Sequence, residues 1–127
     1  MEREGLYVTL KTKINPPLFL FVKGENNMEE SRFQKKLINT LKKIFPGALV
    51  LKNDARYIDS IPDLTVLYKN RWALLEVKES EAACRRSKVR QPNQGYYISK
   101  ARDWSYASYV YPENVDQVLD ELREVFA

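Results

Sequence analysis

Two acidic residues and one lysine flank a hairpin pattern in the middle of the chain. Asp63 directly follows a proline, and Glu76 and Lys78 lie at the end of the second of two apolar runs, 64–68 and 72–77. The Lys-Asn-Arg segment between the runs predicts a hairpin, because asparagine tolerates the left-handed backbone conformation of tight turns. If the runs pair symmetrically about the first two residues of that segment, opposed residues have numbers that sum to 139, as 63 and 76 do. A three-residue loop would break this register.

This pairing would bring the carboxylates of Asp63 and Glu76 face to face. Directly opposed residues of an antiparallel pair have Cβ atoms roughly 4.5–5.5 Å apart, and like charges there are destabilising. A divalent cation would remove the repulsion, and Mg²⁺ is commonly held by one or two carboxylates together with waters and substrate phosphates. Because side chains alternate along a strand, Lys78 is expected on the face of Glu76, with Val77 in the core. An ammonium group there can orient or help deprotonate an attacking water and offset charge on a phosphate.

Each of these features also has an ordinary structural interpretation. Aspartate after proline is common in turns, and a Glu-x-Lys sequence at the end of a strand is often a solvated ion pair. Here the register match, the apolar strands and the Pro-Asp corner occur together, and in combination they favour a metal-assisted site.

The composition excludes several other kinds of chemistry. The chain has 127 residues, enough for one domain with a core, and it contains no histidine and one cysteine. Ser-His-Asp triads, Cys-His pairs, His-ligated zinc and internal disulfides are therefore excluded. Catalysis would have to use carboxylates, lysine and a hard cation. The net charge of +4 and the pI near 9.1 are compatible with a polyanionic partner.

The apolar periodicity predicts an α/β domain in the order helix, three strands, helix, strand, helix. Residues 1–26 are an N-terminal extension in which a hairpin or edge strand is expected. Segment 53–62 is expected to form a loop, the basic segment 79–91 a solvated loop, and Asn114 with Gln117 a capping box. The second strand of the hairpin is apolar on both faces, which predicts a central strand of a covered sheet. The expected ranges are 28–45, 92–103 and 114 onward for the helices, and 48–52, 64–68, 72–77 and 106–111 for the strands.

The amino-acid sequence of the hairpin resembles a known nuclease motif. Pro62-Asp63, followed by Glu-Val-Lys at 76–78, is similar to the motif of the PD-(D/E)XK restriction-endonuclease-like superfamily. The element order resembles the αβββαβ core of that superfamily, a mixed central sheet flanked by helices, with N-terminal strands and a C-terminal helix added here. The Arg-Gln-Pro-Asn-Gln segment at 90–94 and the short chain most resemble the VRR-NUC and phage Holliday-junction-resolvase-like branch. The likeness covers 28–111, and Ser60 stands where that branch would have a glycine.

The resemblance implies roles for individual residues. Asp63 and Glu76 would ligate Mg²⁺ or Mn²⁺ with the carbonyl of Val77, and Lys78 would serve the attacking water in phosphodiester hydrolysis. Gln94 corresponds to a helix-borne glutamine or lysine near the metal.

A glutamate of the first helix often joins the metal site in this family. Glu30 matches that place, with Glu29 as a lesser candidate. Asn27 and Glu30 also spell a capping box, in which Glu30 would only satisfy a backbone N–H group. Both interpretations stay open.

Four cations follow the lysine strand within six residues, and two more lie further along. They are interpreted as a phosphate clamp that is independent of sequence, with a plain solvated loop as the alternative. Four aromatic residues near the fourth strand are interpreted as strand and core residues rather than as base-stacking surfaces. The cations are Arg85, Arg86, Lys88 and Arg90, with Lys100 and Arg102 as an extension of the clamp, and the aromatics are Trp104, Tyr106, Tyr109 and Tyr111.

Together these features predict a single nuclease domain, 1–127, that cuts branched DNA such as Holliday junctions. One small chain carries one site, so cutting two strands suggests a two-fold homodimer, with 1–26 as a candidate contact. Two alternatives stay open: the same chemistry on single-stranded, flap or duplex DNA, and a non-catalytic nucleic-acid-binding module. The lack of a long apolar run and of a signal-peptide pattern predicts a cytoplasmic protein with no membrane partner, in the host cell if phage-encoded. No small-molecule substrate is expected.

Overall fold

The computed structural model describes residues 29–127, which form an α/β fold with a four-stranded mixed sheet. The hairpin or edge strand expected within 1–26, and the expected helix start at Met28, lie outside the described residues. Among residues 29–127, none of the helices has the length and apolar character of a membrane-spanning segment. The helices are α2 (Glu30–Ile44), α3 (Glu81–Arg90), α4 (Pro92–Trp104) and α5 (Val115–Val125), and the strands are β1 (Leu49–Lys52), β2 (Leu64–Tyr68), β3 (Arg71–Val77) and β4 (Tyr106–Val110).

The sheet has the strand order β1-β2-β3-β4, in which β2 is antiparallel to both neighbours and β4 is parallel to β3. Leu64 lies opposite Leu75 and Tyr68 opposite Arg71, so the register is the predicted one, in which opposed numbers sum to 139. The left-handed residue of the turn is Lys69, with a φ of 58°, rather than the asparagine that follows it. Two-residue hairpin turns take a positive φ at their first central position, so the turn geometry overrides the preference of the residue.

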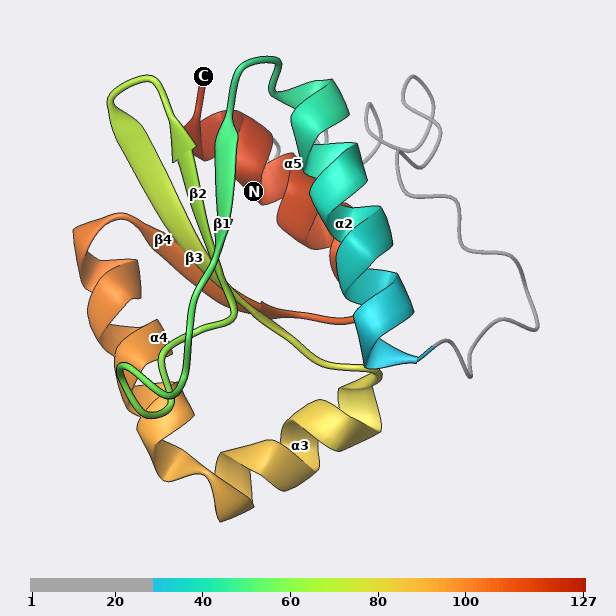
Figure 1. Cartoon of the computed structure of the whole chain (residues 1–127), viewed down its shortest axis with the longest axis vertical. Helices are drawn as coiled ribbons and strands as arrows, with labels where there is room; N and C mark the ends of the chain where they lie inside the picture. The colour runs from blue at the N-terminus through green and yellow to red at the C-terminus, as the bar shows by residue number, and fades with distance from the viewer. Residues whose placement is uncertain (1–28) are drawn as a thin grey trace, which may run out of the picture.

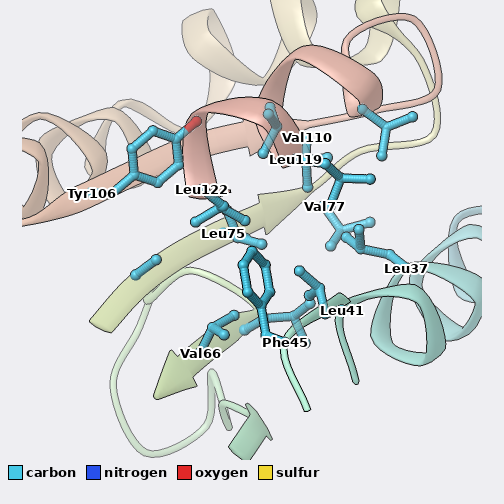
Figure 2. Close-up of a cluster of buried hydrophobic side chains, with 14 of the residues drawn as sticks. Leu37, Leu41, Phe45, Val66, Leu75, Val77, Tyr106, Val110, Leu119 and Leu122 are labelled. Carbon is cyan, nitrogen blue, oxygen red and sulfur yellow. The ribbon is translucent and has the colours of Figure 1, made fainter. Parts of the chain in front are cut away.

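The larger core lies between the sheet and the helices α2 and α5 (Figures 1 and 2). Phe33, Leu37 and Leu41 of α2 are spaced four residues apart, so they share one side of the helix, and all three are fully buried. Facing them are the apolar stripe of α5 and the inward side chains of β2 and β3, which include Val118, Leu119, Leu122, Val66, Leu75 and Val77.

A smaller cluster, which involves α3 and α4, covers the other face of the sheet (Figure 1). Trp72 and Leu74 of β3 pack against this cluster, whereas Leu75 and Val77 belong to the larger core. β3 is therefore covered on both faces, as its apolar pattern predicted. The buried members of the smaller cluster are Cys84, Ile98, Ala101, Ala107 and Tyr109.

Most of the basic segment 79–91 forms helix α3 instead of the predicted loop. Only Cys84 and Ser87 of this helix are buried, so it has no apolar stripe for periodicity to detect. Its start is marked by Ser80, whose hydroxyl oxygen accepts a hydrogen bond from the N–H of Ala83 at 3.0 Å. Alanine, arginine and lysine then favour the helix. The order of elements is therefore helix, three strands, two helices, strand, helix.

Neither of the two capping boxes considered from sequence forms: the one left open for Asn27 and Glu30 does not, and the one predicted for Asn114 and Gln117 is wrong. Glu30 is the first residue of α2, so it cannot be the third-position glutamate of a box that begins at Asn27, which itself lies outside the described residues. Asn114 makes no side-chain cap of α5. Its Oδ1 accepts from the N–H of Tyr111 at 2.8 Å and its Nδ2 donates to the carbonyl of Tyr109 at 3.1 Å. Asn114 therefore ties the end of β4 to the start of α5.

Candidate active site

Asp63 and Glu76 lie side by side where β2 begins and β3 ends. The hairpin register, continued one residue past the pair of Leu64 and Leu75, sets them opposite each other. The N–H of Asp63 donates to Glu76 Oε1 at 3.1 Å, and Asp63 Oδ2 accepts from the N–H of Val77 at 2.8 Å. Each carboxylate is thus held by the backbone of the other strand.

Lys78 and Val77 complete this end of β3. The Nζ of Lys78 lies 3.2 Å from Glu76 Oε2, and both side chains are nearly buried, at 11% and 5% exposure. The N–H of Lys78 donates to the carbonyl of Val110 at 2.9 Å, so pairing with β4 fixes its backbone. The side chain of Val77 is fully buried. In an extended strand the N–H and C=O of a residue face the same neighbour, so the carbonyl of Val77 is directed to the side of Asp63.

Burial raises the pKa of both acids, and the charge of Asp63 raises the pKa of Glu76 further. Burial, followed by the charge of Asp63, raises the pKa of Glu76 from 4.5 to about 7, although Lys78 and the N–H of Asp63 favour the ionised form. The pKa of Asp63 is also raised, chiefly by burial, against the lowering effects of the N–H of Val77, of Lys78 and of a hydrogen bond with the carboxyl of Glu76. The two carboxyls are close enough to share a proton, so they titrate as a pair.

The loop that leads into Asp63 is fixed by Asn53, a residue that sequence reasoning missed. Its Nδ2 donates to the carbonyl of Pro62 at 2.8 Å and to Thr65 Oγ1 at 2.9 Å, and its N–H donates to the carbonyl of Asp63 at 2.8 Å. In the same loop Ser60 has a φ of 65°, in the left-handed region that favours glycine. The family that the sequence resembles would have a glycine at this position. Here the loop adopts the backbone conformation that favours glycine, although the residue is a serine.

Glu30 is exposed at the start of α2, on the rim of the acid pair. The pKa of Glu30 is raised by partial burial of its carboxyl and then by the charges of Asp63 and Glu79, while Lys78 lowers it. These interactions agree with Figure 1, where the start of α2 lies beside the end of β3. Among residues 29–127, no three His, Cys, Asp or Glu side chains converge to hold a metal ion, so Glu30 does not close a three-acid cluster.

Gln94 and Tyr109 bring two polar groups to the face of the sheet that carries Glu76. Tyr109 pairs with Glu76 across β3 and β4, and it is 9% exposed. A Cβ atom at Gly95 would lie 3.7 Å from its hydroxyl oxygen, so that hydroxyl meets the first turn of α4. Within the described part, the hydroxyl of Tyr109 and the Oε1 of Gln94 are buried without a hydrogen-bond partner. Buried polar groups are rarely unpaired, so both are suited to bind a further polar group. Tyr109 was predicted only as a core aromatic.

The four cations predicted as a phosphate clamp lie on α3. A helix turns about 100° per residue, so Arg86 and Arg90 share one flank, and Arg85 and Lys88 the other. Arg85 forms an ion pair with an acid one turn earlier in the helix. The Nζ of Lys88 lies 5.2 Å from the centroid of the Tyr109 ring, so Lys88 reaches back toward the sheet.

The aromatics predicted as strand and core residues divide into two kinds. Tyr106 and Tyr109 are buried, at 6% and 9% exposure, and Tyr111 is half-buried. The prediction is wrong for Trp104, which is 67% exposed. Helix α4 extends one residue further than predicted, to Trp104, and it places this side chain on its outward side.

Comparisons with known proteins assign no family to this chain: no protein-family model, no curated protein and no solved structure matches it. The class of site is therefore defined by its own geometry. It is a pair of acids, half-buried Asp63 and buried Glu76, at the ends of two antiparallel strands, with an amine 3.2 Å from Glu76.

Proposed function

We propose that this protein is a metal-dependent endonuclease that hydrolyses phosphodiester bonds of DNA at a site of the PD-(D/E)XK type. One observation carries the proposal. The carboxyls of half-buried Asp63 and buried Glu76 lie side by side at two strand ends, and the Nζ of Lys78 lies 3.2 Å from Glu76.

A purely structural role accounts poorly for this acid pair. The hydrogen bonds that Asp63 and Glu76 accept from backbone N–H groups could be accepted by asparagine and glutamine, which carry no charge. Instead the pKa of Glu76 is raised to about 7. Each unit of such a shift corresponds to about 1.4 kcal/mol against the ionised form. At these two positions neutral amides would give a more stable protein than acids do. The presence of acids therefore supports a function that uses their charge.

The order of elements also supports the proposal. Helix α2, three antiparallel strands, helix α4 and the parallel strand β4 follow the αβββαβ order of the restriction-endonuclease-like core. This chain adds α3 before α4 and α5 after β4. Asp63 and Glu76 fall at the ends of the second and third strands, as the resemblance implies.

Asp63, Glu76 and the carbonyl of Val77 would hold Mg²⁺ or Mn²⁺. All three are hard oxygen donors, and waters and substrate phosphates complete the coordination of Mg²⁺ in many sites. Because burial and the charge of Asp63 raise the pKa of Glu76 to about 7, a proton on Glu76 can offset the charge of the acid pair when no cation is bound. Bound there, the ion would provide Lewis-acid polarisation of a phosphate oxygen. Glu30 would add negative charge from the rim.

Lys78 would orient the attacking water. Its ammonium group lies on the same strand face as Glu76, where it can also offset charge that develops on the phosphate. The Oε1 of Gln94 and the hydroxyl of Tyr109 would serve as further hydrogen-bond partners for the water or the phosphate.

DNA is the proposed substrate because positive charge is concentrated on α3 and α4. Residues 81–104 contain six cations and two acids, a surplus of +4 that equals the net charge of the whole chain. Cations of this kind bind phosphates and position a nucleic acid without reading its sequence. We favour branched DNA, cut by a two-fold homodimer with two sites, over flap, single-stranded and duplex DNA.

The test is cleavage of a labelled four-way junction, a flap, a single strand and a duplex in Mg²⁺, with EDTA blanks. Glu76→Gln should abolish cutting but keep or improve DNA binding in EDTA, because it removes negative charge beside the phosphate. Glu124→Gln makes the same change at an exposed residue of α5 and should cut normally. Cutting by Glu76→Gln at the unmodified rate would remove Glu76 from the mechanism. An unmodified protein that binds DNA but cuts none of the four in Mg²⁺ or Mn²⁺ would favour a non-catalytic module.

A further inference from the structure

Helix α4 carries an exposed row of two aromatic rings with a lysine between them. Tyr96, Lys100 and Trp104 are spaced four residues apart, so they lie on one side of the helix. Tyr96 is 57% exposed and Trp104 is 67% exposed. The Nζ of Lys100 lies 5.4 Å from the centroid of the Tyr96 ring and 5.3 Å from that of Trp104, and it donates to the hydroxyl of Tyr96 at 3.1 Å. We call these three residues the aromatic row.

The packing of α4 does not depend on the aromatic row. The opposite side of the helix carries Ile98 and Ala101, which are 7% and 4% exposed and belong to the smaller core cluster. Large apolar surface on the outward side of a helix that is already packed is typical of a binding surface. The lysine between the rings makes an apolar protein partner a poor fit and an anionic partner a good one.

We propose that the aromatic row binds unpaired nucleotides of a DNA strand, with bases stacked on Tyr96 and Trp104 and a backbone phosphate at Lys100. The order ring, cation, ring along the helix matches the order base, phosphate, base along a single strand. Eight residues of helix separate the two rings by about 12 Å along the axis. Aromatic platforms flanked by cations are a general means of holding single strands without sequence preference, because every base has a π face.

The position of α4 links the aromatic row to the candidate site. The first turn of α4 lies at Tyr109, the residue that pairs with Glu76, and the helix ends just before β4 begins at the opposite end of the sheet (Figure 1). The aromatic row therefore begins near the acid pair and leads away from it, over the part of the chain that carries the +4 surplus of residues 81–104. A strand that leaves the site unpaired would meet this row. The inference rests on the proposed function and narrows its substrate to branched DNA that carries unpaired nucleotides beside the branch point.

The test is the binding of a labelled oligothymidylate and of a duplex of equal length to the full chain in EDTA, where cleavage plays no part. Trp104→Ala and Tyr96→Ala should each weaken single-strand binding about tenfold, the loss expected for one stacked base, and duplex binding less than about twofold. Trp104→Phe should retain most of the affinity because it keeps a π face. Lys100→Met should reduce the slope of log affinity against log salt by about 0.7, the contribution of one phosphate contact on a single strand.

Intrinsic fluorescence gives a direct readout, since the chain has only two tryptophans. Oligothymidylate should quench the emission of Trp104, and Trp104→Phe should remove this quenching, because Trp72 is half-buried in the smaller cluster. The control is Tyr57→Ala, a change at an aromatic of the loop before β2 that is more exposed, at 86%, than either ring of the row, and it should leave single-strand binding unchanged.

The inference is overturned by unchanged single-strand affinity in both alanine variants, or by equal losses on single strand and duplex. A concentration-dependent dimer that dissociates in Trp104→Ala would assign the aromatic row to self-association and also overturn it. The proposed function fails separately. Selective single-strand binding through the aromatic row without any cleavage would contradict the proposed nuclease activity but not this inference. Cleavage that the row variants leave unchanged would contradict this inference but not the nuclease activity.

Discussion

Replacing Glu76 by glutamine should make the metal-free protein more stable above pH 7, even though it removes the proposed activity. Glu76 is 4% exposed, and its pKa is raised from 4.5 to about 7 by burial and then by the charge of Asp63. Glutamine keeps an oxygen for the N–H of Asp63, which donates to Glu76 at 3.1 Å, but carries no charge. The substitution therefore removes the charge and conserves the packing.

The direction of the effect follows from proton binding. In the unfolded chain Glu76 ionises near pH 4.5, whereas the folded protein retains the proton up to about pH 7. Between these values the folded state binds more protons than the unfolded state, so the free energy of unfolding falls as pH rises. The stabilisation is present in full below pH 4.5 and is lost above pH 7. Each unit of pKa shift corresponds to about 1.4 kcal/mol, so the shift of Glu76 corresponds to a loss of roughly 3 kcal/mol in the free energy of unfolding. The pKa of Asp63 is raised as well, so the measured loss belongs to the pair.

The assay is urea unfolding in EDTA at a series of pH values from 4.5 to 8, for the unmodified protein, Glu76→Gln and Glu124→Gln. Across this pH range the free energy of unfolding of the unmodified protein and of Glu124→Gln should fall by roughly 3 kcal/mol more than that of Glu76→Gln. Mg²⁺ at pH 8 should then stabilise the unmodified protein but have little effect on Glu76→Gln, because ligands stabilise only the state that binds them. Parallel pH profiles for the unmodified protein and Glu76→Gln would refute the reasoning, since Glu76 would then ionise as freely folded as unfolded.

Four further single-residue changes have defined outcomes. Lys78→Met should slow single-turnover cleavage by roughly 100-fold or more and leave DNA binding nearly unchanged. Tyr109→Phe should maintain or raise stability in urea, because its buried hydroxyl has no hydrogen-bond partner among the described residues, and should slow cleavage several-fold, which a packing role alone would not do. Ser60→Gly should raise the free energy of unfolding by up to about 1 kcal/mol, since its φ of 65° is unfavourable for a residue with a side chain, and Ser60→Val should lower it. Leu37→Ala, at a fully buried position of α2, should lower it by about 2–5 kcal/mol.

The hairpin could be predicted from sequence because two independent signals agreed on it. The apolar runs set which residues face the core, and the short turn set the register, so the position of Asp63 opposite Glu76 followed from counting. The helices α2 and α5 were predictable for a similar reason. Each has an apolar stripe wide enough to identify its buried side.

The features that were missed depend on contacts between distant parts of the chain. Helix α3 buries only two residues, so its sequence pattern is that of a polar loop. Asn53 acts through Pro62 and Thr65, nine and twelve residues away. Tyr109 reaches Glu76 only through the parallel pairing of β3 with β4, and no local pattern specifies that register. The exposure of Trp104 depends on where α4 ends, and helix ends are the least predictable part of an element.

Strand β3 contributes both to the candidate site and to the larger core. Because its core residues fix its register, they also hold the two acids together against their repulsion. Leu75 and Val77 lie on one face of β3 and are fully buried, whereas Glu76 lies on the other. A slip of one residue would exchange the faces and force Glu76 into the larger core. Burial of a large apolar side chain contributes about 1.5–3 kcal/mol, so Leu75 and Val77 with their β2 neighbours Leu64 and Val66 contribute roughly 6–12 kcal/mol to the observed register. That exceeds the roughly 3 kcal/mol that ionised Glu76 costs, so burial of the apolar face of β3 fixes the positions of the two carboxylates.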